Sequence, residues 1–313
     1  MSATATRPAA TLKLERVSRW YGDVIALNDV DLTLGPGVTG LLGPNGAGKS
    51  TLIRLVTGLA GSGSGRVTLH GRTVRHDLDV LMRIGHVPDG DGLYDELPAR
   101  DFLLDQARQR GFDPLGARAR ADEVLGRVGL DEAASRRTGS FSKGMRQRLK
   151  LAQALLHDPD VLVLDEPLTG LDPVMRRGFI RIVRELGDEG VTVLVSSHVL
   201  HEIEAMTDQV VLLHHGQVLA EGTVGHIRDL LDRFARRVKV TTDDPRALGA
   251  ALLTLPELVS SATVEDHSVV FETMSPDRLC IELQSRAASG AARILAIEPL
   301  DEDLGSVFSY LVT

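Results

Sequence analysis

Apolar and polar residues alternate between strand-like and helix-like spacing through the first two thirds of the chain. Apolar and polar residues alternate in 11–17 and 30–34, as they do in a half-buried strand. The other strand candidates, several of them apolar throughout, are 38–42, 66–69, 83–88, 161–164, 191–195, 209–213 and 217–220. Helical spacing occurs at 51–56, within 141–156 and at 173–186. Because strands and helices follow one another in turn, the pattern predicts an α/β fold with a mainly parallel sheet.

Two stretches depart from this pattern. Between about 90 and 140 the strand signals stop and helical spacing dominates, which predicts an inserted helical lobe. From about 234 shorter elements follow, and the pattern predicts strands at 237–241, within 262–272 and at 293–297, and helices at 245–253, 275–289 and 301–311. We therefore expect a disordered tail at 1–10, a main domain at 11–233 and a small α+β domain at 234–313.

Residues 43–51 fit the phosphate-binding P-loop pattern G-x-x-x-x-G-K-[ST] between an apolar strand and a helix. Glycines let the backbone N–H groups point at phosphate oxygens, and the helix start adds the positive end of its dipole. Lys49 would neutralise the outer phosphates, Ser50 would ligate Mg²⁺, and Thr51 would add a phosphate contact. The predicted nucleotide-binding residues of the loop are Gly43, Pro44, Asn45, Gly46, Ala47, Gly48, Lys49, Ser50 and Thr51.

Two carboxylates, Asp165 and Glu166, follow the apolar strand at 161–164. Magnesium bound to polyphosphate needs carboxylate support, usually through its waters. We assign this role to Asp165. Glu166 would point to the other face if the strand continued, and could accept a proton from an attacking water.

Composition limits the partners and the compartment. The chain has 313 residues, 43% hydrophobic and 25% charged, and a net charge of −8, which disfavours a nucleic-acid partner held by phosphate contacts. No apolar run approaches the ~18 residues of a membrane helix, so direct insertion into a membrane is not expected. The lone cysteine, Cys280, excludes an internal disulfide, suits a reducing compartment and is expected in the core.

Four further segments give the chain a resemblance to the ATP-binding-cassette (ABC) ATPases over about residues 11–225. Phe-Ser-Lys-Gly-Met-Arg-Gln-Arg at 141–148 resembles the family's signature motif, and Gly-Leu-Asp-Pro at 170–173 resembles its D-loop. Ser197-His198 resembles its switch histidine, and Tyr21 resembles its adenine-stacking aromatic. With the P-loop and Asp165-Glu166, these motifs stand in the family's order.

The resemblance implies a P-loop NTPase core with a mainly parallel sheet, an antiparallel β subdomain and an inserted helical lobe. It implies ATP and Mg²⁺ as ligands, with Glu166 and His198 as catalytic residues. It also implies a head-to-tail homodimer, in which Ser142 and Gly144 contact the γ-phosphate held by the opposite subunit. Asp172 is the D-loop member of the site.

Two positions depart from the family pattern. Lys143 and Met145 stand where Gly and Gln are commoner, and the resulting form resembles one exporter branch. Asp89 occupies the Q-loop position, where Gln is usual. Asp89 either reaches Mg²⁺ through a water or is an ordinary loop carboxylate, and Asp91 is a competing ligand.

Residues 300–308 resemble the ending of ATPases that serve ABC-2-type exporters, including drug-resistance exporters. The resemblance implies an ATPase subunit in the cytoplasm, peripheral at the inner face of the membrane through separately encoded permease subunits. One alternative is a non-transport ABC ATPase that acts as a mechanical clamp. The other is a nucleotide-binding regulator with little turnover. A single cassette without a long coiled-coil insertion, with Glu166 and His198 retained, favours the exporter.

Overall fold

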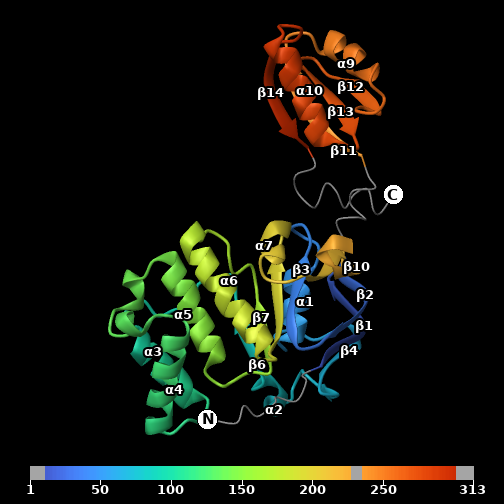
Figure 1. Cartoon of the computed structure of the whole chain (residues 1–313). Helices are drawn as coiled ribbons and strands as arrows, with labels where there is room; N and C mark the ends of the chain where they lie inside the picture. The colour runs from blue at the N-terminus through green and yellow to red at the C-terminus, as the bar shows by residue number, and fades with distance from the viewer. Residues whose placement is uncertain (1–10, 227–234, 301–313) are drawn as a thin grey trace. The chain divides into compact units, whose positions relative to one another are not determined.

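The computed structural model describes residues 11–226 and 235–300, and the chain divides into two compact units between Gly222 and Thr223 (Figure 1). This division lies before the boundary at 233 that the sequence predicts. The expected tail at 1–10 and the expected last helix at 301–311 lie outside the described residues. No helix within the described ranges is both long and apolar enough to cross a bilayer.

A six-stranded sheet forms the centre of the first unit, in the order β10-β9-β3-β8-β7-β6. Its strands are β3 (Gly37–Leu42), β6 (Ile84–Val87), β7 (Val161–Leu164), β8 (Thr192–Ser197), β9 (Gln209–His214) and β10 (Gln217–Thr223). The pairs β3–β8, β3–β9, β7–β8 and β6–β7 are parallel, as predicted. Only His215 and Gly216 join β9 to β10, and both have the positive φ, 45° and 78°, that a two-residue hairpin turn requires.

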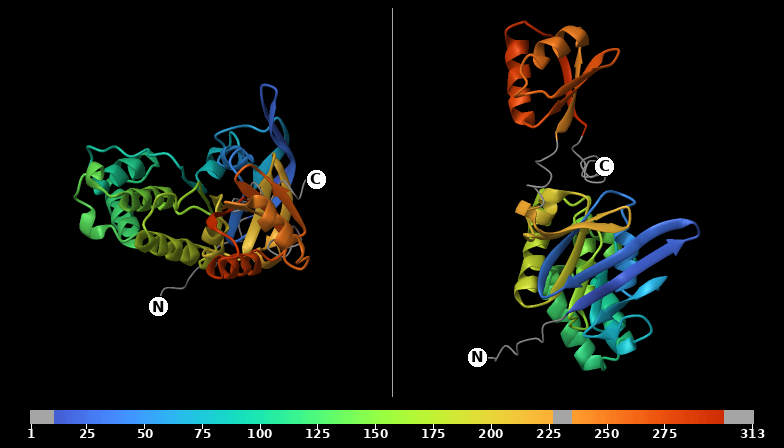
Figure 2. Two further views of the ribbon diagram at one scale, coloured as in Figure 1. Left: turned by 90° about the horizontal axis from the view of Figure 1, so that it is seen from above. Right: turned by 90° about the vertical axis from the view of Figure 1, so that its right-hand side faces the viewer.

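A second sheet is antiparallel and has the order β2-β1-β4-β5. Its strands are β1 (Leu12–Tyr21), β2 (Val24–Leu34), β4 (Ser64–Leu69) and β5 (Arg72–Thr73). Helix α1 (Lys49–Val56) shares one hydrophobic core with both sheets, since Leu14, Ile53 and Leu194 belong to the same buried cluster. Figure 2 shows β1 and β2 as a long ribbon that projects beyond this core. The core therefore fixes the start of α1 at the edge of the parallel sheet.

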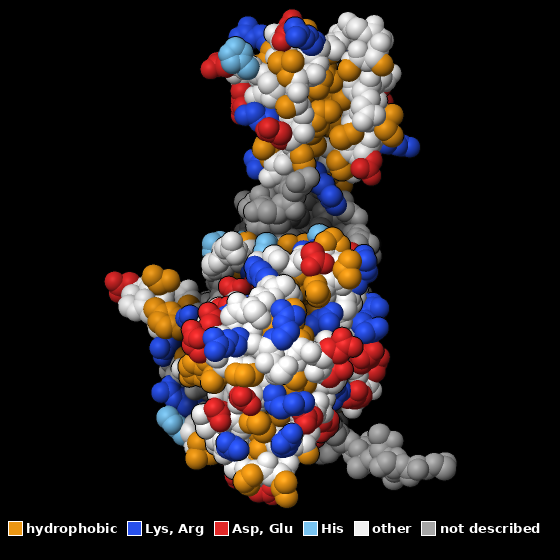
Figure 3. Space-filling model, turned by 90° about the vertical axis from the view of Figure 1, so that its left-hand side faces the viewer, with side chains coloured by type: hydrophobic (Ala, Val, Ile, Leu, Met, Phe, Trp, Pro, Cys, Tyr) orange, Lys and Arg blue, Asp and Glu red, His pale blue; other side chains and the backbone are white. Residues whose placement is uncertain are grey.

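The first unit also contains α2 (Leu78–Leu81), α3 (Ala99–Gln109), α4 (Pro114–Arg127), α5 (Lys143–Leu155), α6 (Pro173–Asp188) and α7 (Leu200–Glu204), with short 3₁₀ turns at Asp131–Ala133 and Thr138–Ser140. Figure 1 shows α3, α4, α5 and α6 gathered on the left of this unit. Helices α3 and α4 form the predicted lobe, and α5 packs against both of them and against β6. Helix α5 thus joins the lobe to the sheet. Figure 3 shows acidic and basic side chains interspersed over the face it presents.

The second unit has the element order β-α-β-β-α-β, and its antiparallel sheet has the order β12-β13-β11-β14, which is a ferredoxin-like arrangement. The elements are β11 (Arg236–Thr242), α9 (Pro245–Leu253), β12 (Ser261–Val264), β13 (Ser268–Thr273), α10 (Pro276–Ala288) and β14 (Ile294–Pro299). Val240, Phe271 and Leu279 belong to its separate core. Cys280 was expected in this core but is only half-buried on α10.

A chain that ends at Leu231 should fold without the second unit, because among the described residues the cluster with Leu14 and the cluster with Val240 share no side chain. We expect one cooperative thermal transition and ATP affinity within about twofold of the full chain, which corresponds to roughly 0.4 kcal/mol. Calorimetry and nucleotide titration measure both. An insoluble or non-cooperative fragment would show that the units depend on each other.

Half-buried His86 on β6 should make the first unit sensitive to acid. Burial lowers the pKa of His86, with Lys150 acting in the same direction and Asp165 in the opposite one, and Nε2 finds no hydrogen-bond partner among the described residues. As the pH falls, His86 therefore takes up a proton more readily in the unfolded chain than in the folded chain. Stability should fall as the pH drops below about 6.5.

Replacing His86 by Gln should make this fall shallower, by up to about 1 kcal/mol per pH unit. Urea unfolding at several pH values between about 7 and 5.5 measures the slope. His201→Gln is the matched control, since that side chain is exposed in the same unit. Equal slopes in the parent and in His86→Gln would contradict the assignment.

Candidate functional site

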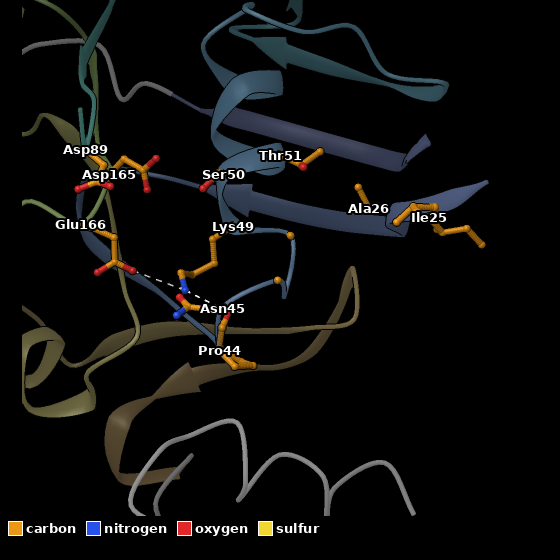
Figure 4. Close-up of a pocket in the computed structure, with 13 residues that line it drawn as sticks. Ile25, Ala26, Pro44, Asn45, Lys49, Ser50, Thr51, Asp89, Asp165 and Glu166 are labelled. Carbon is orange, nitrogen blue, oxygen red and sulfur yellow. Dashed lines mark hydrogen bonds and ion pairs between the residues drawn. The ribbon is translucent and has the colours of Figure 1, made fainter. Parts of the chain in front are cut away.

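A pocket of about 330 Å³ opens at the carboxyl ends of β3 and β7, beside the start of α1 (Figure 4). Carboxyl ends of neighbouring parallel strands meet at one edge of a sheet, where ligands of α/β proteins bind. The lining residues are Val24, Ile25, Ala26, Pro44, Asn45, Gly46, Gly48, Lys49, Ser50, Thr51, Asp89, Asp165 and Glu166. The P-loop and both carboxylates that follow β7 thus come together in one pocket.

The glycines of the P-loop are required by close backbone contacts. A Cβ at Gly43 would lie 2.2 Å from the Leu213 carbonyl oxygen, and a Cβ at Gly48 would lie 2.6 Å from that of Ala26. Gly48, the residue directly before α1, has φ of 107°. As a glycine it has no side chain that could cap the helix. The first residues of α1, Lys49, Ser50 and Thr51, line the pocket and have no side-chain cap, which suits their N–H groups to phosphate oxygens.

Lys49 is held inside this loop, and only 7% of its side chain is exposed. Its Nζ donates to the carbonyl oxygens of Gly43 at 2.5 Å and Pro44 at 3.2 Å, and lies 3.5 Å from Glu166 Oε1. Burial lowers the pKa of Lys49, and the charge and hydrogen bond of Glu166 act in the opposite direction. The pocket therefore contains a preplaced cation whose present partners an anionic phosphate could replace.

Asp165 and Glu166 both face the pocket, so the expectation that Glu166 points to the opposite face was wrong. Strand β7 ends at Leu164 and Glu166 has φ of 45°, which breaks the alternation of a strand. Ser196 fixes this turn, since its Oγ donates to Asp165 Oδ1 at 2.7 Å and accepts from Glu166 N at 2.9 Å. Sequence reasoning gave Ser196 no role.

The His198 side chain is next to Glu166. Its Nδ1 lies 3.0 Å from Glu166 Oε2, and 48% of the side chain is exposed. The contacts thus run from Lys49 through Glu166 to His198. The three side chains come from the P-loop, the end of β7 and the end of β8.

Asp89 lines the pocket, whereas Asp91 is turned to Arg146 and its Oδ2 lies 2.6 Å from Nε. This favours Asp89 over Asp91 as the residue that reaches the site. Across residues 11–226 and 235–300, no three His, Cys, Asp or Glu side chains gather as a ready-made metal site.

Seven predicted residues are not among those that line this pocket: Gly43, Ala47 and His198, which are next to lining residues, and four others. Tyr21 is 40% exposed at the end of β1, and the Arg19 guanidinium lies 4.8 Å from its ring centre. Ser142 accepts from Met145 N at 3.3 Å and caps α5, while Asp172 accepts from the N–H groups of residues 174 and 175 and caps α6. Gly144 is buried on α5. None of these four residues is among those that line the P-loop pocket of the same chain.

The apolar wall of the pocket was not predicted. Val24, Ile25 and Ala26 begin β2 and line the pocket. Figure 4 shows Ile25 and Ala26 on the side opposite the carboxylates. Val24 and Ile25 are 66% and 52% exposed. The only sequence signal near them was the aromatic pair at 20–21.

Comparison with known proteins identifies the family of the chain. The ABC transporter family profile matches residues 27–169. The chain is 40% identical over 204 residues to the ABC transporter ATP-binding protein NatA of Bacillus subtilis (strain 168), a match that covers 64% of this chain and 83% of NatA. The chain belongs to the ABC transporter ATP-binding proteins. The resemblance stated from its motifs is thereby confirmed.

Two further comparisons agree with this family. The daunorubicin resistance ATP-binding protein DrrA3 of Streptomyces coeruleorubidus is 36% identical over 286 residues, which cover 91% of this chain and 87% of DrrA3. A solved ATP-binding subunit of an ABC transporter has a TM-score of 0.63 and 30% identity, covering 70% of this chain and 92% of that one. The P-loop NTPase fold is confirmed, and the ABC ATPase family to which the chain belongs hydrolyses ATP.

Lys49→Ala should weaken ATP binding by this ABC ATPase at least tenfold, about 1.4 kcal/mol, because the pocket loses its buried cation. Calorimetric titration with ATP measures the affinity, and the melting temperature shows that the fold survives. Lys13→Ala, at an exposed position on β1, is the control. Equal affinity of the parent and Lys49→Ala would remove Lys49 from the nucleotide site.

Proposed function

We propose that this chain is the ATP-hydrolysing subunit of an exporter and drives transport through separate permease subunits. The observation that carries the proposal is the contact series from Lys49 through Glu166 to His198 beside the P-loop. It combines a phosphate-binding cation with a base and a residue that orients the base. A regulator without turnover would not need the last two.

ATP binding would rearrange the ion pair of the pocket. The γ-phosphate competes with the Glu166 carboxylate for Lys49, since both are anions within reach of the same buried ammonium. Once released from Lys49, Glu166 can accept a proton from the attacking water, and His198 Nδ1 holds the carboxylate in place. The other ring nitrogen, Nε2, remains for the phosphate.

The residues also fit Mg²⁺, which is bound in such sites by one or two carboxylates together with substrate phosphates. Ser50, Asp165 and Asp89 supply oxygen atoms on one side of the pocket. The ion would neutralise charge on the phosphates. The nucleotide base would lie against the apolar wall at Val24 and Ile25, with Tyr21 at the edge of the same hairpin.

The signature residues support a head-to-tail homodimer. Ser142 is exposed at the start of the 13-residue helix α5, and lies outside the chain's own P-loop pocket. A helix start with an exposed hydroxyl suits a phosphate. A second copy of the chain would bring its nucleotide to Ser142 and Gly144, and Asp172 would lie beside the same junction.

The export role is supported by the DrrA3 relative, which is named for daunorubicin resistance. Its match of 286 residues is longer than the first unit, so the similarity extends into the second unit. A permease partner would place the chain at the inner face of the membrane. Neither relative favours the alternatives of a mechanical clamp or a regulator.

Glu166→Gln should slow ATP hydrolysis at least a hundredfold, because an amide cannot act as the base. ATP binding should be retained, since Lys49 loses a competitor. ATP should then hold two copies together. Light scattering with and without MgATP, at protein concentrations well above the ATP dissociation constant, measures the dimer.

The double variant Lys49→Ala/Glu166→Gln is the control and should remain monomeric. A Glu166→Gln variant that binds ATP and stays monomeric would exclude the homodimer. It would leave pairing with a different cassette as the way to complete the site.

A further inference from the structure

Two basic side chains of α5 hold the loop that carries Asp89. Lys150 and Arg146 are four residues apart, so they lie on the same face of the helix. The loop runs from Pro88, directly after β6, toward α3. Asp89 lies in it and lines the nucleotide pocket. Helix α5, which begins at the signature motif, therefore also contacts the loop that brings Asp89 to the nucleotide pocket.

Lys150 is the more buried of the two, with 6% exposure. Its Nζ donates to three successive carbonyl oxygens, those of Pro88 at 2.9 Å, Gly90 at 3.1 Å and Asp89 at 3.5 Å. An ammonium has three N–H donors, and here main-chain oxygens take all of them. Burial lowers the pKa of Lys150, and the charges of Asp91 and Asp89 act in the opposite direction. The shape of the backbone at Asp89 is thus fixed by one cation.

Arg146 fixes the following part of the loop. Its Nε donates to Asp91 Oδ2 at 2.6 Å, and its Nη1 donates to Asp95 Oδ1 at 2.6 Å and to the Thr138 carbonyl oxygen at 3.0 Å. Gly90 and Gly92 have open space where a Cβ would stand, so the loop has little packing of its own. Its conformation depends on α5 because two glycines leave it flexible.

We propose that Lys150 is a positioning residue that holds Asp89 in the nucleotide pocket and joins its loop to the signature helix. The inference rests on the proposed ATPase function. Ser142 stands about two turns before Lys150, roughly 12 Å along one continuous helix. A shift of Asp89 on nucleotide binding would therefore move Ser142 and Gly144, which face the nucleotide of the second copy in the proposed dimer. Lys150 would thus couple the two nucleotide sites.

A double-mutant cycle tests the positioning role against a merely structural one. Asp89→Ala should lower kcat about tenfold and Lys150→Met about fivefold, each with less than a twofold change in KM for ATP. In the Asp89→Ala background, Lys150→Met should change kcat less than twofold, because the residue that it positions is gone. Lys150→Gln, which keeps N–H donors without the charge, is measured in parallel in case Lys150→Met does not fold.

Hydrogen–deuterium exchange of the protein without nucleotide gives a second readout. Lys150→Met should speed exchange in residues 88–92 at least fivefold and leave residues 43–51 of the P-loop unchanged. Arg148→Met is the matched control, since Arg148 is a basic residue of α5 whose Nη1 lies 3.5 Å from the Val128 carbonyl oxygen. Its effect on kcat should be the same in the parent and in the Asp89→Ala background.

Three results would overturn the proposal. They are an equal effect of Lys150→Met in both backgrounds, no effect of Asp89→Ala or Lys150→Met on kcat, and unchanged exchange at 88–92. If Asp91→Ala is impaired while Asp89→Ala is not, the loop serves the site through Asp91 instead. If the parent protein hydrolyses no ATP, the proposed function itself is contradicted, and this outcome is distinguishable from the three results above.

Discussion

The candidate site depends on the adjacency of three parallel strands. Strands β3, β8 and β7 lie side by side, with Leu42 paired to Ser197 and Leu164 paired to Val195. Parallel pairing aligns their carboxyl ends, so the P-loop, His198 and Glu166 emerge at one edge. Segments separated by more than a hundred residues thereby become one pocket. Helix α1 adds its N–H groups because the shared core of the two sheets fixes where it begins.

Electrostatics at this edge balance a buried cation against anions that can be exchanged. Lys49 is removed from water, which is unfavourable unless its charge is compensated. Two main-chain carbonyls and Glu166 compensate it. A nucleotide phosphate offers more negative charge than one carboxylate, so binding can displace Glu166 toward water and toward His198. In the proposed function, the same ion pair that stabilises Lys49 would link nucleotide binding to the availability of Glu166 as the base.

The sequence predicted the features that local chemistry encodes. The P-loop, the strand before it and the carboxylates after 161–164 are local patterns, and the P-loop and the carboxylates meet in the pocket. The direction of Glu166 was wrong because a positive φ cannot be read from strand alternation. The wall at Val24 and Ile25 was missed because it depends on where a distant hairpin packs. Lys150 was missed for the same reason, since its three carbonyl partners lie about sixty residues earlier.

Helix α5 shows how the signature motif tolerates its two unusual residues. Ser142 caps the helix through Met145 N, a main-chain contact that does not depend on the Met145 side chain. Gly144 is also needed for packing, because a Cβ there would lie 2.8 Å from Met175 Cγ on α6. Lys143 extends to the D-loop, where its Nζ occupies the space that a Cβ at Gly170 would take. Lys143 thus acts through its side chain and Met145 through its main chain, whereas the retained Ser142 and Gly144 set the cap and the packing of α5.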